Sequence, residues 1–194
     1  MEEKALAKVS DVMTEPMEYG KVFAESGIFP DVKSAAQGAI KVLAGKEVGL
    51  SPLQSLNAFY FVNGRLAMVV QAMAALIKKS GKYDYQIEEQ TAEGCTISFY
   101  LLGGGKKELI GKSTFDKIKA AKAGIINKDN YKNYPENMYF ARSLANGARW
   151  YCPDAISGFY TVEELQDLEP SVSKEKTITI DAEGEVKEDA GNQA

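Results

Sequence analysis

The sequence predicts an α+β fold, in which a small antiparallel sheet packs against helices. The sheet is expected to comprise a hairpin over residues 59–68 and strands between residues 83 and 114. Two patterns support this class: Asn63-Gly64 lies between alternating apolar and polar residues, and residues 137–153 have the apolar spacing of a helix. With 45% hydrophobic residues in a 194-residue chain, there is enough apolar side-chain volume for one buried core.

Helices are expected before the hairpin. A first helix should begin at Thr14 as its cap and run to about Glu25, and a second should run from residue 32 to about Gly45. The run Ser51-Pro-Leu-Gln54 has the order of a capping box with proline in the first turn, so a short third helix should start there.

The Asn63-Gly64 turn fixes the register of the hairpin, because a two-residue turn places the flanking residues opposite one another. The residues expected on the core face are Phe59, Phe61, Leu66 and Met68. Tyr60 and Arg65 then share the other face, where they form either a half-exposed surface pair or part of a platform for bases and phosphates.

The remaining elements are predicted from the spacing of apolar residues and from the positions of turn-forming residues. In chain order we expect a helix ending in Lys78-Lys79-Ser80-Gly81, strands over 83–90, 95–102 and 108–114 with a flexible basic loop over 103–107, a lysine-rich helix over about 115–123, a loop containing Asn127, Asp129 and Asn130, the helix over 137–153, and a short acidic helix beginning at Thr161.

The helix over 137–153 has an apolar side and a polar stripe. At 100° per residue, Arg142, Asn146 and Arg149 fall within about 60° of one another, away from Met138 and Leu144 on the packing side. Such a stripe could bind phosphates, or it could be an ordinary solvated face.

Charge is distributed unevenly along the chain. Residues 161–194 hold ten acidic side chains and three lysines, a net charge of −7, whereas the other 160 residues hold 20 basic and 17 acidic side chains, a net charge of +3. Residues 101–150 alone carry +6, from ten basic and four acidic side chains. We therefore expect one domain over residues 1–165 and an acidic, disordered tail over 166–194, with a polyanion as partner and a tail that either competes with it or only keeps the protein soluble.

Several classes of chemistry are excluded. The absence of histidine removes imidazole-dependent hydrolases, imidazole-liganded zinc and histidine phosphotransfer, and Cys95 and Cys152 are too few for a disulfide framework, so both are expected to be buried. Gly111-Lys112-Ser113 does not have P-loop spacing and falls in an expected strand. A charged amino terminus and the lack of a long apolar run indicate a cytoplasmic protein.

These observations predict a protein that is not an enzyme and has no catalytic residue, metal or cofactor. One enzymatic alternative stays open: a metal-dependent nuclease, if Asp84, Asp116, Asp129 and Glu136 converge in space.

The order of elements resembles a known family. The run Gly49-Leu-Ser-Pro, the strand pair, the helix closing on Lys78-Lys79-Ser80-Gly81 with Tyr83 beyond it, and the late helix with Arg142 and Arg149 ending near Pro153 are similar to the RecT family of phage single-strand DNA annealing proteins. The chain differs from many members at Val70, Gln71 and Ala72, where they have Tyr-Arg-Gly, and in the separation of Arg142 from Arg149.

The resemblance implies ATP-independent binding of single-stranded DNA in a basic groove and annealing of complementary strands in phage-type homologous recombination. It also implies a ring or helical homo-oligomer, and the tail could contact a phage exonuclease or a host single-strand binding protein. The residues expected to contact DNA are Tyr60, Arg65, Lys78, Lys79, Lys112, Lys117, Lys119, Lys122, Lys132, Arg142, Asn146 and Arg149. Tyr131 and Tyr134 are further candidates for stacking on bases. The alternative outside enzymes is a phage assembly or protein-interaction module that does not bind DNA.

Overall fold

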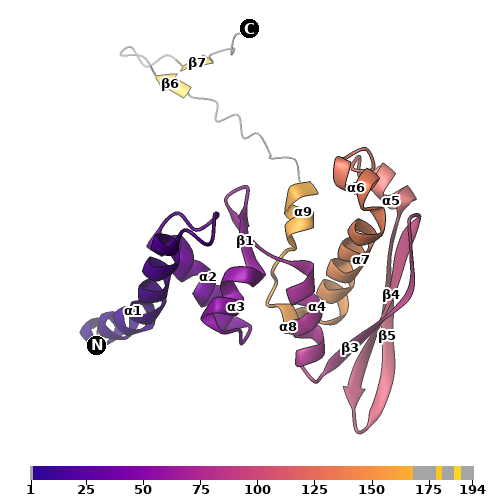
Figure 1. The fold of residues 1–194 in the computed structure, drawn as a ribbon, viewed down its shortest axis with the longest axis horizontal. Helices are drawn as coiled ribbons and strands as arrows, with labels where there is room; N and C mark the ends of the chain where they lie inside the picture. Colours follow the sequence, from indigo (N-terminus) through magenta and orange to yellow (C-terminus); the bar gives the residue numbers. More distant parts are fainter. Residues whose placement is uncertain (1, 168–177, 181–185, 189–194) are drawn as a thin grey trace.

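The computed structural model describes residues 2–167, 178–180 and 186–188, and there the chain has the expected α+β class (Figure 1). The helices are α1 (Glu2–Ser26), α2 (Ala35–Glu47), α3 (Pro52–Ala58), α4 (Val70–Lys79), α5 (Lys117–Lys122), α6 (Asp129–Asn133), α7 (Pro135–Tyr151), α8 (Pro153–Ile156) and α9 (Val162–Asp167). The strands are β1 (Phe59–Val62), β2 (Arg65–Met68), β3 (Tyr83–Thr91), β4 (Gly94–Gly103), β5 (Lys106–Asp116), β6 (Ile178–Ile180) and β7 (Val186–Glu188).

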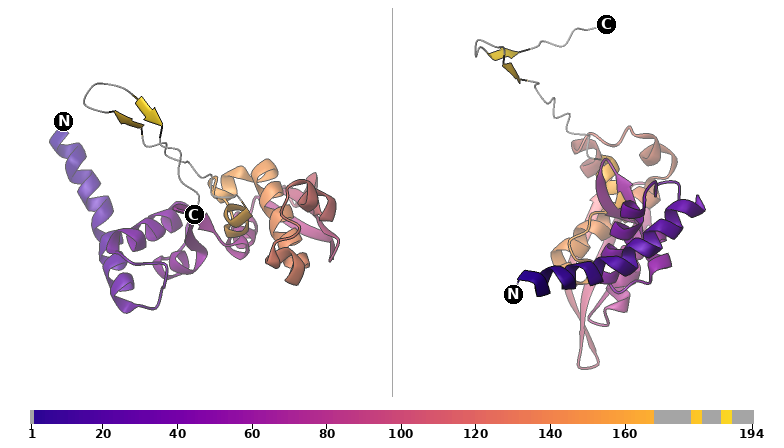
Figure 2. Two further views of the ribbon diagram at one scale, coloured as in Figure 1. Left: turned by 90° about the horizontal axis from the view of Figure 1, so that it is seen from above. Right: turned by 90° about the vertical axis from the view of Figure 1, so that its left-hand side faces the viewer.

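The elements form an elongated body. Figure 1 shows α1, α2 and α3 at one end, the sheet of β3, β4 and β5 at the other, and α4, α7 and α8 between them. Figure 2 shows α1 extending beyond the helices it packs on. Among the described residues, a small apolar cluster around Val32, Val42 and Leu56 serves the helical end, and a larger cluster fills the space between α4, α7 and the sheet.

The helical end depends on close packing and on one buried ion pair. A Cβ at Gly20 in α1 would overlap the backbone of α2, and one at Gly38 in α2 would overlap Gly20, so these helices approach closely. Lys41 of α2 is fully buried, with Nζ 2.5 Å from Asp31 Oδ2 and donating to the Leu56 carbonyl oxygen at 3.3 Å. Burial lowers the pKa of Lys41, and the Asp31 carboxylate opposes this shift.

Two local predictions are confirmed. Ser51 caps α3 with the full capping box, in which the Ser51 side chain accepts from the Gln54 N–H and the Gln54 side chain accepts from the Ser51 N–H. In the hairpin, Phe59 pairs with Met68 and Val62 with Arg65, the register set by the Asn63-Gly64 turn. Asn63 and Gly64 have φ of 51° and 74°, the left-handed conformation that this type of turn requires.

The larger sheet has the order β3-β4-β5, all antiparallel, with a register shift near Ile87 and another opposite Phe99. The expected loop over 103–107 is wrong in extent: Lys106 lies in β5 and pairs with Gly103, leaving a two-residue turn at Gly104 and Gly105. Both turn glycines have positive φ, which allows the strands to join without a longer loop. The run Gly111-Lys112-Ser113 lies inside β5, as expected.

Helix α7 packs directly on this sheet. A Cβ at Gly147 would overlap the ring of Phe99 on β4, and one at Gly111 on β5 would overlap the ring of Tyr151 at the end of α7. The Ser143 hydroxyl donates to the Cys95 carbonyl oxygen at 2.7 Å. Small residues at the contact therefore let the helix backbone approach the strands.

Three helix predictions need correction. Thr14 does not begin the first helix, because α1 starts at Glu2 and continues through Pro16; the residues before Thr14 include good helix formers. The second helix starts at Ala35, where the Ser34 side chain accepts from the Gln37 N–H, so Val32 lies before it. The loop expected around Asp129 contains the short helix α6.

The expected boundary between domain and tail, at residues 165 and 166, falls inside α9. Within the tail, Ile178–Ile180 and Val186–Glu188 form the antiparallel pair β6–β7, where disorder was expected; β-branched residues such as Ile178 and Val186 favour an extended backbone. The prediction of disorder for the rest of the tail lies outside the described residues. Across the part of the chain described, no helix is both long and apolar enough to cross a bilayer.

The contact between α7 and β4 gives a stability prediction. Gly147→Ala should lower the free energy of unfolding by about 1 to 3 kcal/mol, because the added methyl group overlaps the Phe99 ring in a packed core. Gly103→Ala is the control, since a Cβ there meets nothing within 4 Å and should change stability by less than about 0.5 kcal/mol. Denaturant unfolding compares the two, and equal effects would contradict the close contact.

Candidate nucleic-acid interface

The twelve residues expected to contact DNA are distributed over four parts of the fold. Tyr60 and Arg65 lie on the β1–β2 hairpin, Lys78 and Lys79 at the end of α4, five lysines between β5 and α6, and three residues on α7. In the described structure each of these groups has its own set of contacts.

The polar stripe of α7 forms, but α9 covers it. Both guanidinium Nη groups of Arg149 bond to the Glu164 carboxylate, with Nη1 at 2.7 Å from Oε2, and Nη2 also donates to Asn146 Oδ1 at 3.0 Å. Glu164 is only 4% exposed, and the Arg149 guanidinium lies over the Tyr160 ring at 5.1 Å. Arg149 and Asn146 therefore bond to protein groups here.

A second carboxylate of α9 holds the other end of the stripe. Asp167 accepts from the Tyr131 hydroxyl at 2.7 Å and lies 3.5 Å from Lys128 Nζ and 3.8 Å from Arg142 Nη1. Arg142 also lies over the Phe115 ring at 5.1 Å. Tyr131 is buried and its pKa is raised by burial and by Asp167, so the suggestion that it stacks on bases does not fit its position.

Helix α9 is also tied to the hairpin. The Met68 N–H donates to the Tyr160 carbonyl oxygen at 2.8 Å, and Asn63 Nδ2 donates to the Leu165 carbonyl oxygen at 3.3 Å. The buried Glu164 carboxylate also accepts from the Thr161 N–H at 3.0 Å, which caps α9. Arg142 and Arg149 thus link α9 to α7, while Met68 and Asn63 link it and the residues before it to the hairpin.

Lysines of α4 and the sheet meet at Asp84. Lys78 Nζ lies 2.6 Å from Asp84 Oδ1 and Lys107 Nζ lies 2.9 Å from Oδ2. Burial opposes ionisation of Asp84, but the bonds from both lysines outweigh it and lower the pKa of this carboxyl to about 2. Lys79 instead donates to the Gly49 carbonyl oxygen at 2.6 Å.

The lysines nearest α5 and α6 are the least engaged. Lys117 pairs with Glu93 at 3.2 Å, Lys119 Nζ donates to the Thr114 carbonyl oxygen at 2.5 Å, and Lys112 lies 4.0 Å from Glu88. Lys122 and Lys132 are exposed. Within the described residues neither has a carboxylate within ion-pair distance. The hairpin residues are similar in exposure, since Arg65 is exposed and Tyr60 is 39% exposed.

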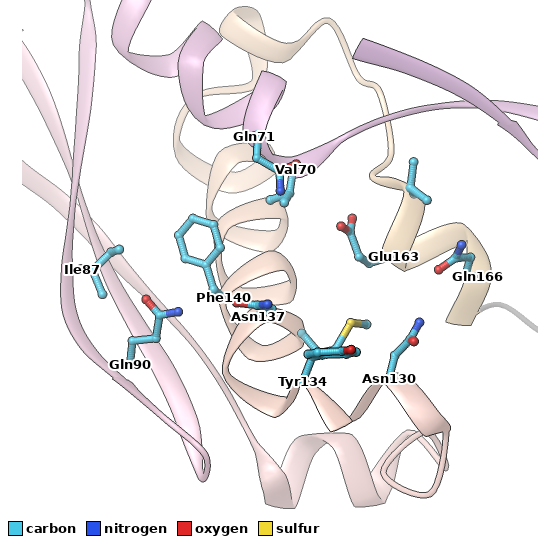
Figure 3. A pocket seen from close by; sticks show the side chains of 12 residues that line it. Val70, Gln71, Ile87, Gln90, Asn130, Tyr134, Asn137, Phe140, Glu163 and Gln166 are labelled. Carbon is cyan, nitrogen blue, oxygen red and sulfur yellow. The ribbon is translucent and has the colours of Figure 1, made fainter. Parts of the chain in front are cut away.

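A cavity of about 510 Å³ opens between α4, β3, α7 and α9, near α6 (Figure 3). Its lining consists of Val70, Gln71, Ile87, Gln90, Asn130, Tyr134, Asn137, Met138, Phe140, Val162, Glu163 and Gln166. Five of these side chains are amides, and they come from α4, β3, α6, α7 and α9. No lysine or arginine is among the twelve.

The pocket combines ring faces with free hydrogen-bonding groups. Tyr134 is 63% exposed and Phe140 is half-buried. Figure 3 shows Glu163 extending from α9 into the space between α9 and α7. Its Oε2 is shielded from solvent without a hydrogen-bond partner among the described residues, and burial raises the pKa of this carboxyl.

Sequence reasoning did not identify this pocket. Its amides are exposed residues on five elements, so no hydrophobic period identifies them. The sequence did contain one signal, since Asn130, Asn133 and Asn137 recur at spacings of three and four, the spacing of one helix face. Tyr134-Pro135, however, divides these residues between two helices. Asn133 does not line the cavity.

The carboxylates of the nuclease alternative do not gather around one point. Asp84 pairs with Tyr100 and Asp116 with Gly94, so their partners lie six residue steps apart along β4, about 20 Å. Among the described residues, no three histidine, cysteine or acidic side chains are grouped so that they could hold a metal ion. Cys95 and Cys152 are buried, as predicted, and burial raises their thiol pKa values to about 11 and about 12.

The bidentate pair gives a second stability prediction. Glu164→Gln should lower the free energy of unfolding by about 2 to 4 kcal/mol, because Arg149 keeps its charge in a partly buried site but loses the carboxylate. Thermal unfolding at neutral pH measures the loss. Preserved stability would mean that α9 does not need this pair to stay in place.

Glu163→Gln is the matched control at the neighbouring position, and it should raise the free energy of unfolding instead of lowering it. Because the folded-state pKa of Glu163 lies above its ordinary value, ionisation at neutral pH opposes folding. The variant should therefore be more stable than the parent chain at pH 7, and the difference should vanish below about pH 4, where the parent carboxyl is protonated in both states. Unfolding curves across this pH range test it; a variant that is less stable at pH 7 would contradict it.

Comparison of the chain with protein-family models, with curated proteins and with solved structures gives no match. The resemblance to the RecT family stays a prediction.

Proposed function

We propose that this protein binds single-stranded DNA and anneals complementary strands without ATP, as a non-enzymatic component of phage-type homologous recombination. The proposal combines the resemblance in element order with the physical properties of the described surface. It includes a homo-oligomer that lines up a long strand, and a tail that contacts an exonuclease or single-strand binding protein.

Annealing makes modest chemical demands. Two complementary strands repel through their phosphates, so a protein that neutralises these charges lowers the barrier to pairing, and base pairing supplies the driving force. No nucleophile, general base or metal is required. The basic stretch 101–150, with its net charge of +6, suits such a role.

The observation that carries the proposal is the position of Tyr134. Its ring is 63% exposed, it lies at the junction of α6 and α7, and it lines the amide pocket on one side. Lys132, exposed and without a carboxylate partner among the described residues, is two residues away. An exposed aromatic ring and an exposed lysine on the same surface segment are a usual combination in proteins that bind single strands, since the ring stacks on bases while lysines contact phosphates.

Apolar residues on α1 support the oligomer. Val12 and Val22 of α1 are each 62% exposed and Met17 of the same helix is 38% exposed, and Figure 2 shows this helix extending beyond the helices it packs on. Exposed apolar side chains gathered on one helix favour a protein contact. The same observation favours the alternative of a protein-interaction module, which differs in predicting no affinity for DNA.

The direct test is annealing of two labelled complementary oligonucleotides without ATP, across a salt series, compared with spontaneous pairing. The double variant Lys122→Gln, Lys132→Gln should weaken binding to every sequence and reduce the slope of log affinity against log salt by about 1.4, since each lost phosphate contact on a single strand contributes about 0.7. Lys21→Gln, Lys33→Gln is the control, because it removes equal charge from the α1–α2 end. Equal effects of the two pairs would show that only net charge matters.

A second test increases binding. Asp84→Asn should tighten binding to single strands several-fold at low salt, because it releases Lys78 and Lys107 from their shared carboxylate. Glu108→Gln removes the same charge from β5, the strand that carries Lys107, without releasing a lysine, since Glu108 has no ion pair among the described residues. Fluorescence anisotropy compares the two. If both variants bind alike, the lysines at Asp84 are not part of the interface.

A further inference from the structure

The pocket framed by α4, β3, α7 and α9 lacks the cations that would bind a phosphate. Its twelve lining residues include one carboxylate and no cation, so an anionic group entering it would meet Glu163 and no counter-charge. The lining therefore disfavours an anionic occupant, and its five amides suit a polar group that can both donate and accept hydrogen bonds. The volume of about 510 Å³ is within the range of small-molecule sites and is large enough for one planar ring with its attached sugar.

The side chains that line the pocket restrict the chemical class of the occupant further. Tyr134 offers an exposed ring face, and Phe140 and Ile87 offer apolar contact on the same cavity. Figure 3 shows Phe140 and Ile87 toward the sheet and Tyr134 below the pocket centre, with Gln90 and Asn137 between them. A ring that stacks on an aromatic face while its edge meets amides has the chemistry of a nucleobase.

The amide side chains also allow the pocket to accept different bases. Each Asn or Gln offers two donor hydrogens and an acceptor oxygen, and a half-turn of the amide exchanges their positions. In the described structure the amides of Gln71, Gln90 and Asn137 make no hydrogen bond to protein groups, so they can turn to match any base edge. A fixed array of charged or already bonded groups would select one base.

We infer that this cavity is a subsite for one unpaired nucleobase of a bound single strand, which it holds by stacking on Tyr134 and by adaptable amide contacts. The inference rests on the proposed binding of single-stranded DNA and adds where one base of the bound strand is held. The phosphates of the same strand lie outside the pocket, near Lys132 and the other lysines of α5 and α6.

The experiment compares the full chain with two oligonucleotides of equal length and charge, one of thymidines and one of abasic residues. The wild-type chain should bind the thymidine strand about tenfold more tightly or better, the range expected for base stacking. The double variant Gln90→Ala, Asn137→Ala should reduce this ratio at least about threefold and leave the abasic affinity unchanged. Gln86→Ala, Asn133→Ala is the matched control, since Gln86 lies on the same strand and neither residue lines the pocket.

The possible results test the proposed DNA binding and the base subsite separately. If the wild type binds neither strand, the proposed function fails and the subsite with it. If it binds both strands equally, or if the pocket variant weakens both equally, DNA binding stands and the base subsite is overturned. Thermal unfolding of each variant controls for folding, and the single changes at Gln90 and Asn137 replace the double variant if it is destabilised. Strands of adenine or cytosine should give ratios similar to thymine; a strong preference for one base would overturn the adaptable-amide account.

Discussion

The close approach of α7 to the sheet is the constraint on which the rest of the structure depends. A glycine at position 147 lets the α7 backbone lie against the Phe99 ring, and the ring of Tyr151 occupies the space above Gly111 at the other end of the contact. Helix α7 then touches α4, α6, α8 and α9 as well as the sheet. Because Asn137 and Phe140 project from this helix, its position relative to β3 determines whether the pocket exists at all.

The arginines of α7 show how one pattern can serve two purposes. A stripe of Arg142, Asn146 and Arg149 is typical of phosphate binding, and the same spacing suits two carboxylates on a short helix laid across it. Glu164 and Asp167 are three residues apart on α9, so they share a face and meet the two arginines together. A buried ion pair contributes little net stability compared with apolar packing, but it fixes geometry, and here it fixes the α9 wall of the pocket.

What could be predicted from the sequence was local. The capping box at Ser51 and the turn at Asn63-Gly64 depend on neighbouring residues, so their geometry follows from a few positions. Thr14 was misleading because a good cap residue can also lie inside a helix when helix formers precede it. The covering of Arg149 depends on Glu164, fifteen residues away across a turn, and no periodicity reports that contact. The pocket is less predictable still, because its amides come from five elements whose relative placement is a tertiary property.

Under the proposed annealing function, a pocket without cations next to exposed lysines would also resolve a conflict. A protein that held bases tightly would block the pairing it promotes, whereas one that held only phosphates would leave bases free to stack within their own strand. Amide contacts compete with water and are individually weak, so a complementary strand can displace them, since each stacked base-pair step contributes about 1.4 kcal/mol. Holding one base at Tyr134 by stacking, with its pairing edge exchangeable, would keep the strand unfolded while the lysines outside neutralise its charge. The separation of these two functions between a cavity without cations and exposed lysines is what a purely basic groove would lack.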